Sequence, residues 1–376
     1  MIYLDNAAST RVDDAVIARM VEVMREDYGN PSAAHPFGAA ARRRIASARA
    51  QVLAGLGDAG AVGDLVWTSG GTESNALGVL GAARAGGPGA IVVSVLEHPA
   101  VAASAAMAGP GRDVRVAPVT PAGTLDLDAT LALVDAATRV VAVMLVSNEL
   151  GTVQPVAELA AAVHARWPEV HVHCDATQAL GKIDVDVAAL GVDSLGVAGH
   201  KLHGPKGVGA LWVRHGAALT PLWGGGGQQR GLRQGTQDAP GAAGLGVAVE
   251  RACAARAAAT VRWRGFADVI TARIAEAGLA WRSLAGAPGA PHILALAFDR
   301  VSADGLREVL ASRGVIASAG SACAGPTGKP AGALAAIGLP PSWGMARLSF
   351  GLDTTAEEVA AAAGVVVGAV RDLAGG

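Results

Sequence analysis

The sequence predicts an α/β protein with two domains: a large domain built on a mainly parallel seven-stranded sheet, and a smaller C-terminal α/β domain. Three observations lead to this prediction. Short apolar runs alternate with longer amphipathic segments up to residue 213. A glycine run at 224–227 marks a change of pattern. A chain of 376 residues is also long enough for two hydrophobic cores.

Seven apolar runs in the first part of the chain are predicted strands, and they lie at 64–68, 90–95, 113–117, 140–145, 170–175, 193–197 and 209–213. Helical patterns lie between many of them, for example at 73–85, 99–108 and 155–166. Strands that alternate with helices form largely parallel sheets with helices on both faces. We therefore expect one such sheet.

A second pattern follows the glycine run. An alanine-rich stretch at 239–277 predicts a long helix, short strands are expected near 292–298 and 315–318, and a helix near 356–373 closes the chain. We expect a large domain of residues 15–245. The small domain would comprise 246–376 together with an N-terminal arm, residues 1–14.

The composition excludes several classes of protein. The formal net charge is −2 and 51% of the residues are hydrophobic. A nucleic-acid binder would show a basic stripe, a membrane span needs about 20 consecutive apolar residues, and a signal peptide has a basic start followed by an apolar region. The sequence has none of these features, so we expect a cytoplasmic protein that binds neither nucleic acid nor membrane.

The three cysteines are too few and too widely spaced for a disulfide framework or a zinc site. No metal is therefore expected, and any cysteine function belongs to a single thiol. Cys323 is the candidate, because it lies among small residues and glycines at 317–325, in a pattern typical of an exposed loop where a thiolate can form. A lone cysteine is more often a small core residue, which is our expectation for Cys174.

Residues 199–207, Gly-His-Lys-Leu-His-Gly-Pro-Lys-Gly, are predicted to form a polar loop between two strands. Lysine forms Schiff bases and must be deprotonated to do so. Lys201 beside His200 is therefore a candidate for imine chemistry, with a solvated surface pair as the alternative. The segment 68–75, Thr-Ser-Gly-Gly-Thr-Glu-Ser-Asn, follows a strand and opens a helix, which suits a phosphate or an ordinary helix cap.

Polar side chains also follow other predicted strands. Asp175 ends one of them, and a carboxylate there is costly to bury without a cationic partner such as a protonated pyridine nitrogen; a helix N-cap is the alternative. His98 and Asn148 follow two more strands, where a structural histidine and a turn residue are the alternatives. Arg347 lies in an alternating pattern and can bind a carboxylate through two parallel hydrogen bonds, or lie on the surface.

These motifs resemble the cysteine desulfurases, which are pyridoxal 5'-phosphate (PLP) enzymes of the class V aminotransferase group. The likeness runs from YLDNAAST at Tyr3 to RLSFG at Gly351, and its most specific part is AGHKLHGPKGVGAL around Lys201. It implies the fold type I arrangement of PLP-dependent transferases, a homodimer, and conversion of L-cysteine to L-alanine with a persulfide on Cys323. The persulfide sulfur would pass to an acceptor protein. The pathway of that acceptor stays open among iron–sulfur biogenesis, tRNA thiolation, cofactor synthesis and DNA modification.

The resemblance also implies roles for individual residues. Catalysis would involve Lys201, Cys323 and His98, and the substrate would contact Asn6, Asn148 and Arg347. The cofactor would contact Gly71, Thr72, His98, Asn148, Asp175, Gln178, His200, Lys201 and, from the partner subunit, Thr236.

Two positions depart from the family pattern. Ala198 replaces a serine that usually binds the phosphate, which removes one hydroxyl donor at a net cost of about 1 kcal/mol. Gln228 replaces a histidine. The alternatives to a cysteine desulfurase are a selenocysteine lyase, a cysteine sulfinate desulfinase, a class V aminotransferase, and a non-enzymatic sulfur-relay scaffold.

Overall fold

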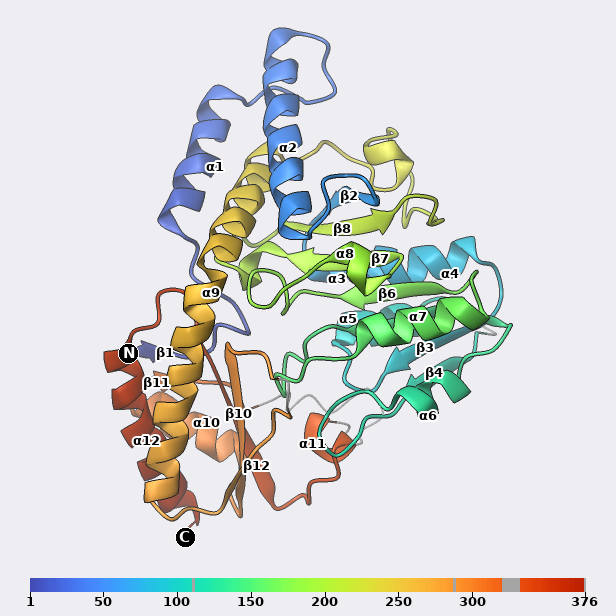
Figure 1. Ribbon diagram of the computed structural model, residues 1–376. Helices are drawn as coiled ribbons and strands as arrows, with labels where there is room; N and C mark the ends of the chain where they lie inside the picture. Colours follow the sequence, from blue (N-terminus) through green and yellow to red (C-terminus); the bar gives the residue numbers. More distant parts are fainter. Residues whose placement is uncertain (110–111, 287–288, 320–331, 375–376) are drawn as a thin grey trace.

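The computed structural model describes residues 1–109, 112–286, 289–319 and 332–374, and it confirms the predicted α/β architecture (Figure 1). All seven predicted strands of the large sheet are present: β2 (Gly63–Thr68), β3 (Ala90–Ser94), β4 (Val114–Ala117), β5 (Thr138–Met144), β6 (His171–Asp175), β7 (Ser194–Ala198) and β8 (Gly209–Arg214). Their order is β2-β8-β7-β6-β5-β3-β4. Only β8 runs against its neighbours in this sheet, so the sheet is mainly parallel.

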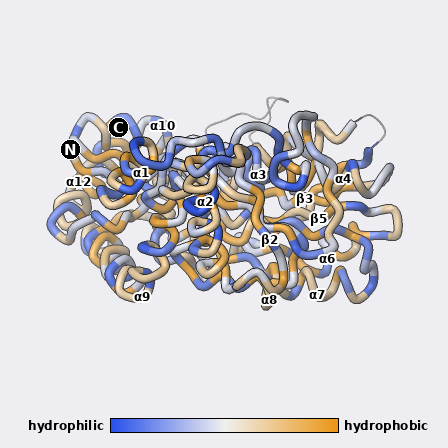
Figure 2. The backbone as a smooth tube through the Cα atoms, turned by 90° about the horizontal axis from the view of Figure 1, so that it is seen from above, coloured by the Kyte–Doolittle hydropathy of each residue, from blue (hydrophilic) through white to orange (hydrophobic). Residues whose placement is uncertain are grey.

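Helices cover the sheet, which explains why β3, β6 and β7 are buried at every position and appear in the sequence as continuous apolar runs. Figure 2 shows the hydrophobic segments mostly inside the molecule and many hydrophilic ones along its outline. The helices of this part are α1 (Asp14–Glu26), α2 (Pro36–Gly55), α3 (Gly71–Ala76), α4 (Ala82–Ala85), α5 (Pro99–Ala106), α6 (Leu127–Ala132), α7 (Val156–Arg166) and α8 (Val187–Leu190).

The predicted helix at 73–85 differs from the prediction in its geometry. Between α3 and α4 the chain forms a π-helical turn, Leu77–Gly81, so the three segments make one continuous helix with a widened middle. A hydrophobic pattern does not distinguish a π turn from an α turn. Wide turns of this kind are often found at functional sites.

The C-terminal part has its own sheet, in the order β12 (Trp343–Ser349), β10 (Ile293–Asp299) and β9 (Trp281–Ser283). Helices α10 (Ala303–Ser312), α11 (Ala333–Ala336) and α12 (Ala356–Ala374) accompany it. The start of the chain joins this part, because β1 (Ile2–Tyr3) pairs in parallel with β11 (Val315–Ile316).

One long helix, α9 (Ala239–Glu276), connects the two parts, as its length in Figure 1 shows. Its first half contributes buried residues to the core beside the large sheet, and its second half contributes to a separate core around β10 and β12. Asp238 caps it by accepting from the Gly241 N–H at 2.9 Å. In the described part of the chain, no helix combines the length and apolar character that a membrane crossing requires.

Candidate active site

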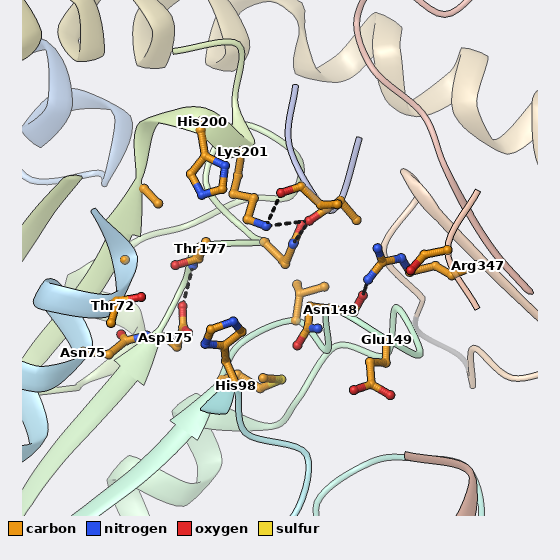
Figure 3. A pocket seen from close by; sticks show the side chains of 18 residues that line it. Thr72, Asn75, His98, Asn148, Glu149, Asp175, Thr177, His200, Lys201 and Arg347 are labelled. Carbon is orange, nitrogen blue, oxygen red and sulfur yellow. Dashed lines mark hydrogen bonds between the residues drawn. The ribbon is translucent and has the colours of Figure 1, made fainter. Parts of the chain in front are cut away.

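A cavity of about 470 Å³ opens where the carboxyl ends of the parallel strands meet (Figure 3). His98 follows β3, Asn148 follows β5, Asp175 ends β6, and Lys201 lies in the single 3₁₀ turn after β7. Arg347 enters from β12, so the C-terminal part completes the wall. Ligands of open α/β sheets bind at this edge because loops of adjacent strands converge there. The fold therefore brings together residues from five separate sequence segments.

Lys201 directs its amine to the N-terminal arm. Nζ donates to the carbonyl oxygens of Ala7 and Ala8, both at 2.7 Å. Burial, and then the nearby Arg347 guanidinium, lower the pKa of Lys201 to about 8. An appreciable fraction of the amine is thus unprotonated near neutral pH, which is the form that attacks a carbonyl carbon.

Asp175 lies at the floor of the cavity and is almost completely buried. Its Oδ2 accepts from Asn75 Nδ2 at 2.6 Å and its Oδ1 accepts from the Thr177 N–H at 2.9 Å. Glu97 lies nearby, and burial, followed by the charge of Asp175, raises the pKa of Glu97 well above its usual value. Ionisation of Glu97 is therefore disfavoured beside Asp175.

His98 caps helix α5 as well as lining the cavity. Its Nδ1 accepts from the Ala100 N–H at 3.1 Å, so the neutral ring carries its proton on Nε2. Burial lowers the pKa of His98, an effect that the Asp175 charge opposes. The ring can therefore donate from Nε2, while Nδ1 is committed to the helix cap.

One end of the cavity is lined by Gly71, Thr72, Ala198 and His200. Gly70, just before α3, has φ 146°, a conformation that favours glycine. The Thr177 hydroxyl points to this end (Figure 3), and a Cβ on Gly71 would lie 3.1 Å from its oxygen. Among the described residues this buried oxygen has no hydrogen-bond partner. It is available to a ligand.

Arg347 lies at the opposite end of the cavity. Arg347 donates from Nη1 to the Asn148 carbonyl oxygen at 2.7 Å and from Nη2 to Asp5 Oδ1 at 2.8 Å. Its Nε is buried and has no partner within the described part of the chain. Ser318 also lines the cavity, and its backbone pairs with that of Arg347. This end can receive a carboxylate.

Most of the predicted site residues line this cavity: Gly71, Thr72, His98, Asn148, Asp175, Gln178, His200, Lys201 and Arg347. Three do not. Asn6 is buried beside the cavity and donates to the Ser349 carbonyl oxygen at 3.0 Å, so its neighbours Ala7 and Ala8 line the wall instead. Thr236 is exposed on the loop after the glycine run. Cys323 lies outside the described residues.

The loop after the glycine run is anchored by side-chain hydrogen bonds. Gln229 accepts from the Trp67 N–H at 2.5 Å and donates to the Trp67 carbonyl oxygen at 2.9 Å. Arg233 pairs with Glu73 at 2.9 Å. Gln228, where the family has histidine, accepts from the Gly235 N–H at 2.9 Å. The loop that carries Thr236 is therefore held against β2 and α3.

Asn75 and Thr177 also line the cavity, although neither is among the predicted site residues. Asn75 ends the segment 68–75, one turn after Gly71, and Thr177 lies two residues after Asp175. Helical spacing gave a signal for Asn75, because positions four apart share a face. Cys174 is fully buried and burial raises its pKa well above the usual value, so it is the inert core thiol that was predicted.

The donor set fits pyridoxal 5'-phosphate. An amine with a lowered pKa can hold the aldehyde, Asp175 can face a protonated ring nitrogen, and the free Thr177 hydroxyl lies with Thr72 and His200 at an end suited to the phosphate. The fold and the site together define a PLP-dependent enzyme of fold type I.

Comparison with known proteins supports this class of enzyme. The class-V aminotransferase model matches residues 2–361. A cysteine desulfurase of Gluconacetobacter diazotrophicus is 37% identical over 99% of this chain and 94% of its own length. A solved NifS-like protein superimposes with a TM-score of 0.91 at 31% identity, over 99% of this chain and 100% of its own. A structure of SspA in complex with cysteine gives a TM-score of 0.80 at 30% identity, over 93% and 99% of the two chains.

The chain therefore belongs to the class-V aminotransferase family, among its PLP-dependent cysteine desulfurases.

Proposed function

We propose that this protein removes sulfur from L-cysteine, releases L-alanine and holds the sulfur as a persulfide on Cys323. The observation that carries the proposal is the arrangement of one cavity, in which Lys201 and Asp175 suit the cofactor and the cationic Arg347 suits a carboxylate. The cysteine desulfurases among its relatives, and the relative solved with cysteine, support this substrate.

Bound PLP supplies an aldehyde for amines and a cationic ring that takes up electrons. Asp175, whose carboxylate is oriented by Asn75 and Thr177, would keep the ring nitrogen protonated. Arg347, whose Nε has no partner among the described residues, would hold the substrate carboxylate. Thr177, Thr72 and His200 would hold the phosphate.

Lys201 and His98 divide the proton transfers. With a pKa of about 8, the Lys201 amine would be able to take the Cα proton of the substrate. His98 presents Nε2–H while Nδ1 caps α5, so it suits the donation of a proton. We assign the base to Lys201 and the acid to His98.

Sulfur transfer falls to Cys323. Its thiolate attacks the substrate Sγ, an S–S bond forms, and the Cβ–Sγ bond breaks. The electron pair of that bond stays with the substrate carbon and is protonated there, which yields alanine. Ser318, five residues before Cys323, lines the cavity, and five residues span up to about 17 Å. The thiol is therefore within chain reach of the substrate.

The alternative functions differ from a cysteine desulfurase in their need for the Cys323 thiol. Release of selenium from selenocysteine or sulfite from cysteine sulfinate depends less on it, and a class V aminotransferase has no use for it. A sulfur-relay scaffold without turnover would need no lysine of lowered pKa opposite Asp175. The Cys323→Ala variant therefore separates the desulfurase from these alternatives.

The test is the production of alanine and sulfide from L-cysteine with a reductant present, for wild type and Cys323→Ala. We expect equal amounts of both products from wild type and loss of both in the variant. Cys253→Ala is the matched control, because Cys253 lies on α9 outside the cavity lining. A wild type that binds PLP but forms neither product refutes the substrate, and an active Cys323→Ala refutes the role of the thiol.

Three further features are proposed with this function. The protein acts as a homodimer in which Thr236, on an exposed and anchored loop, contacts the partner subunit's cofactor. It works in the cytoplasm, where reducing conditions keep a thiol free, and passes sulfur to an acceptor protein. We also propose a large domain of residues 15–245 and a small domain of 1–14 and 246–376; the pairing of β1 with β11 supports the place of the N-terminal arm in the small domain.

A further inference from the structure

A chain of buried polar side chains leads from Asp175 away from the cavity. Asp175 Oδ2 accepts from Asn75 Nδ2 at 2.6 Å, and Asn75 Oδ1 lies 3.1 Å from His173 Nε2. His173 Nδ1 lies 2.8 Å from Ser194 Oγ, which lies 2.7 Å from His171 Nε2. These hydrogen bonds link α3, β6 and β7 behind the carboxylate that faces the cofactor.

The direction of each bond follows from the carboxylate at the end. An ionised carboxylate only accepts, so Asn75 turns its NH₂ group to Asp175 and its oxygen to His173. His173 then donates from Nε2, and its Nδ1 is left to accept the Ser194 hydroxyl proton. Ser194 in turn accepts from His171. All donors point toward Asp175, and bonds aligned in this way polarise one another.

Both histidines have the protonation state that this chain of bonds requires. Burial lowers the pKa of His173 to about 3 and that of His171 to about 4. Each ring is therefore neutral at pH 7, with one nitrogen that donates and one that accepts. A charged imidazolium would donate from both nitrogens and could not accept from Ser194.

The fold leaves room for the two middle members of the chain. A Cβ on Gly78 would lie 2.3 Å from His173 Nδ1, and a Cβ on Gly196 would lie 2.5 Å from Asn75 Oδ1. Gly78 lies in the π-helical turn Leu77–Gly81 that follows Asn75. The widened turn and the two glycines thus make a slot that the imidazole of His173 and the amide of Asn75 fill.

We propose that His173 is a positioning residue of the cofactor site: with Ser194 and His171 it fixes the amide of Asn75, and through that amide the carboxylate of Asp175. The inference rests on the proposed function, because it takes Asp175 as the partner of the cofactor ring nitrogen. A set of core polar groups that only stabilises the fold is the competing explanation, and it predicts no effect on the cofactor.

The experiment titrates apo protein with PLP and follows the visible absorption of the bound cofactor against pH. His173→Phe keeps a ring in the slot but removes both nitrogens. We expect its Kd for PLP to rise about ten-fold, as for other groups that orient a ligand-binding side chain. We also expect the pH midpoint of the visible band to shift, because ring-nitrogen protonation depends on Asp175. Ser194→Ala leaves the Asn75 contact and should weaken binding about three-fold.

The control is His215→Phe, the same substitution at an exposed histidine whose ring contacts the Gly60 carbonyl oxygen at 3.2 Å, away from this chain of bonds. It should change neither Kd nor the pH midpoint. Combining His173→Phe with Asn75→Ala should weaken binding no more than Asn75→Ala alone, since His173 acts through that amide.

A wild type that fails to bind PLP overturns the proposed function before any variant is compared. A His173→Phe protein that melts at a lower temperature, yet keeps the wild-type Kd and pH midpoint, overturns the positioning role. Additive effects of the two substitutions would show that His173 does not act through Asn75, and would also overturn it.

Discussion

The lowered pKa of Lys201 predicts how fast the apo protein binds its cofactor. Attack on the PLP aldehyde requires the unprotonated amine. With a pKa of about 8, about one tenth of the Lys201 amines are unprotonated at pH 7, against about 0.03% for an ordinary lysine at 10.5. The reactive fraction is thus about 300-fold larger. We expect the rate of covalent attachment to rise with pH and to level off above about pH 8.

Stopped-flow mixing of apo protein with PLP measures this rate across pH 6 to 11. The Lys201→Ala variant is the control, because any absorbance change that it shows does not come from attachment to Lys201. Arg347→Gln adds a second check, because the arginine charge helps to lower the pKa of Lys201. The variant should move the midpoint to higher pH. A wild-type midpoint near 10, or one that ignores Arg347, would refute the assignment of Lys201 as a lysine activated by its surroundings.

Three other predictions test individual side chains. Lys182 has a buried Nζ without a partner in the described chain, and burial lowers its pKa to about 7. Because the pKa of Lys182 is lower in the folded than in the unfolded protein, the free energy of unfolding falls as pH drops from about 10 to 7. In urea unfolding, Lys182→Met should be more stable than wild type by about 1–3 kcal/mol at pH 7 and no more stable above pH 10.5. Equal stability of the two proteins at pH 7 would contradict this. Thr177→Val should weaken PLP binding about five-fold in titration at an unchanged melting temperature, whereas an unchanged Kd would remove the hydroxyl from the phosphate site. Arg347→Lys should raise KM for cysteine about ten-fold or more, because lysine lacks the paired donors, while PLP binding stays intact; an unaltered KM would place the carboxylate elsewhere.

Several site residues could be predicted because they end strands. A continuous apolar run identifies a buried strand, and the carboxyl ends of parallel strands meet at one edge. His98, Asp175 and Lys201 could therefore be placed together before any coordinates. The antiparallel direction of β8 and the π turn after Asn75 could not, because neither changes the hydrophobic period from which the elements were predicted.

Hydrogen bonds between side chains far apart in the sequence could not be predicted from the hydrophobic pattern. Asn75 and His173 lie 98 residues apart in the chain, and their contact depends on how α3 packs against β6. Asn6 shows the related problem of register. The N-terminal segment reaches the cavity as predicted, but its backbone turns Ala7 and Ala8 to the wall and leaves Asn6 bonded to Ser349. One position along the chain separates a wall residue from a structural one.

The effect of having alanine at position 198, where the family usually has serine, can be assessed only from the structure. By sequence it removes a hydroxyl from the phosphate end. In the cavity, a Cβ on Gly71 would lie 3.3 Å from the Ala198 methyl and 3.1 Å from the Thr177 oxygen, so both side chains face the same point. Thr177 Oγ1 has no partner among the described residues. We therefore expect the Thr177 hydroxyl to offset the donor that is missing at position 198. If so, Ala198→Ser in the Thr177→Val background should restore the PLP affinity that the valine removes in titration.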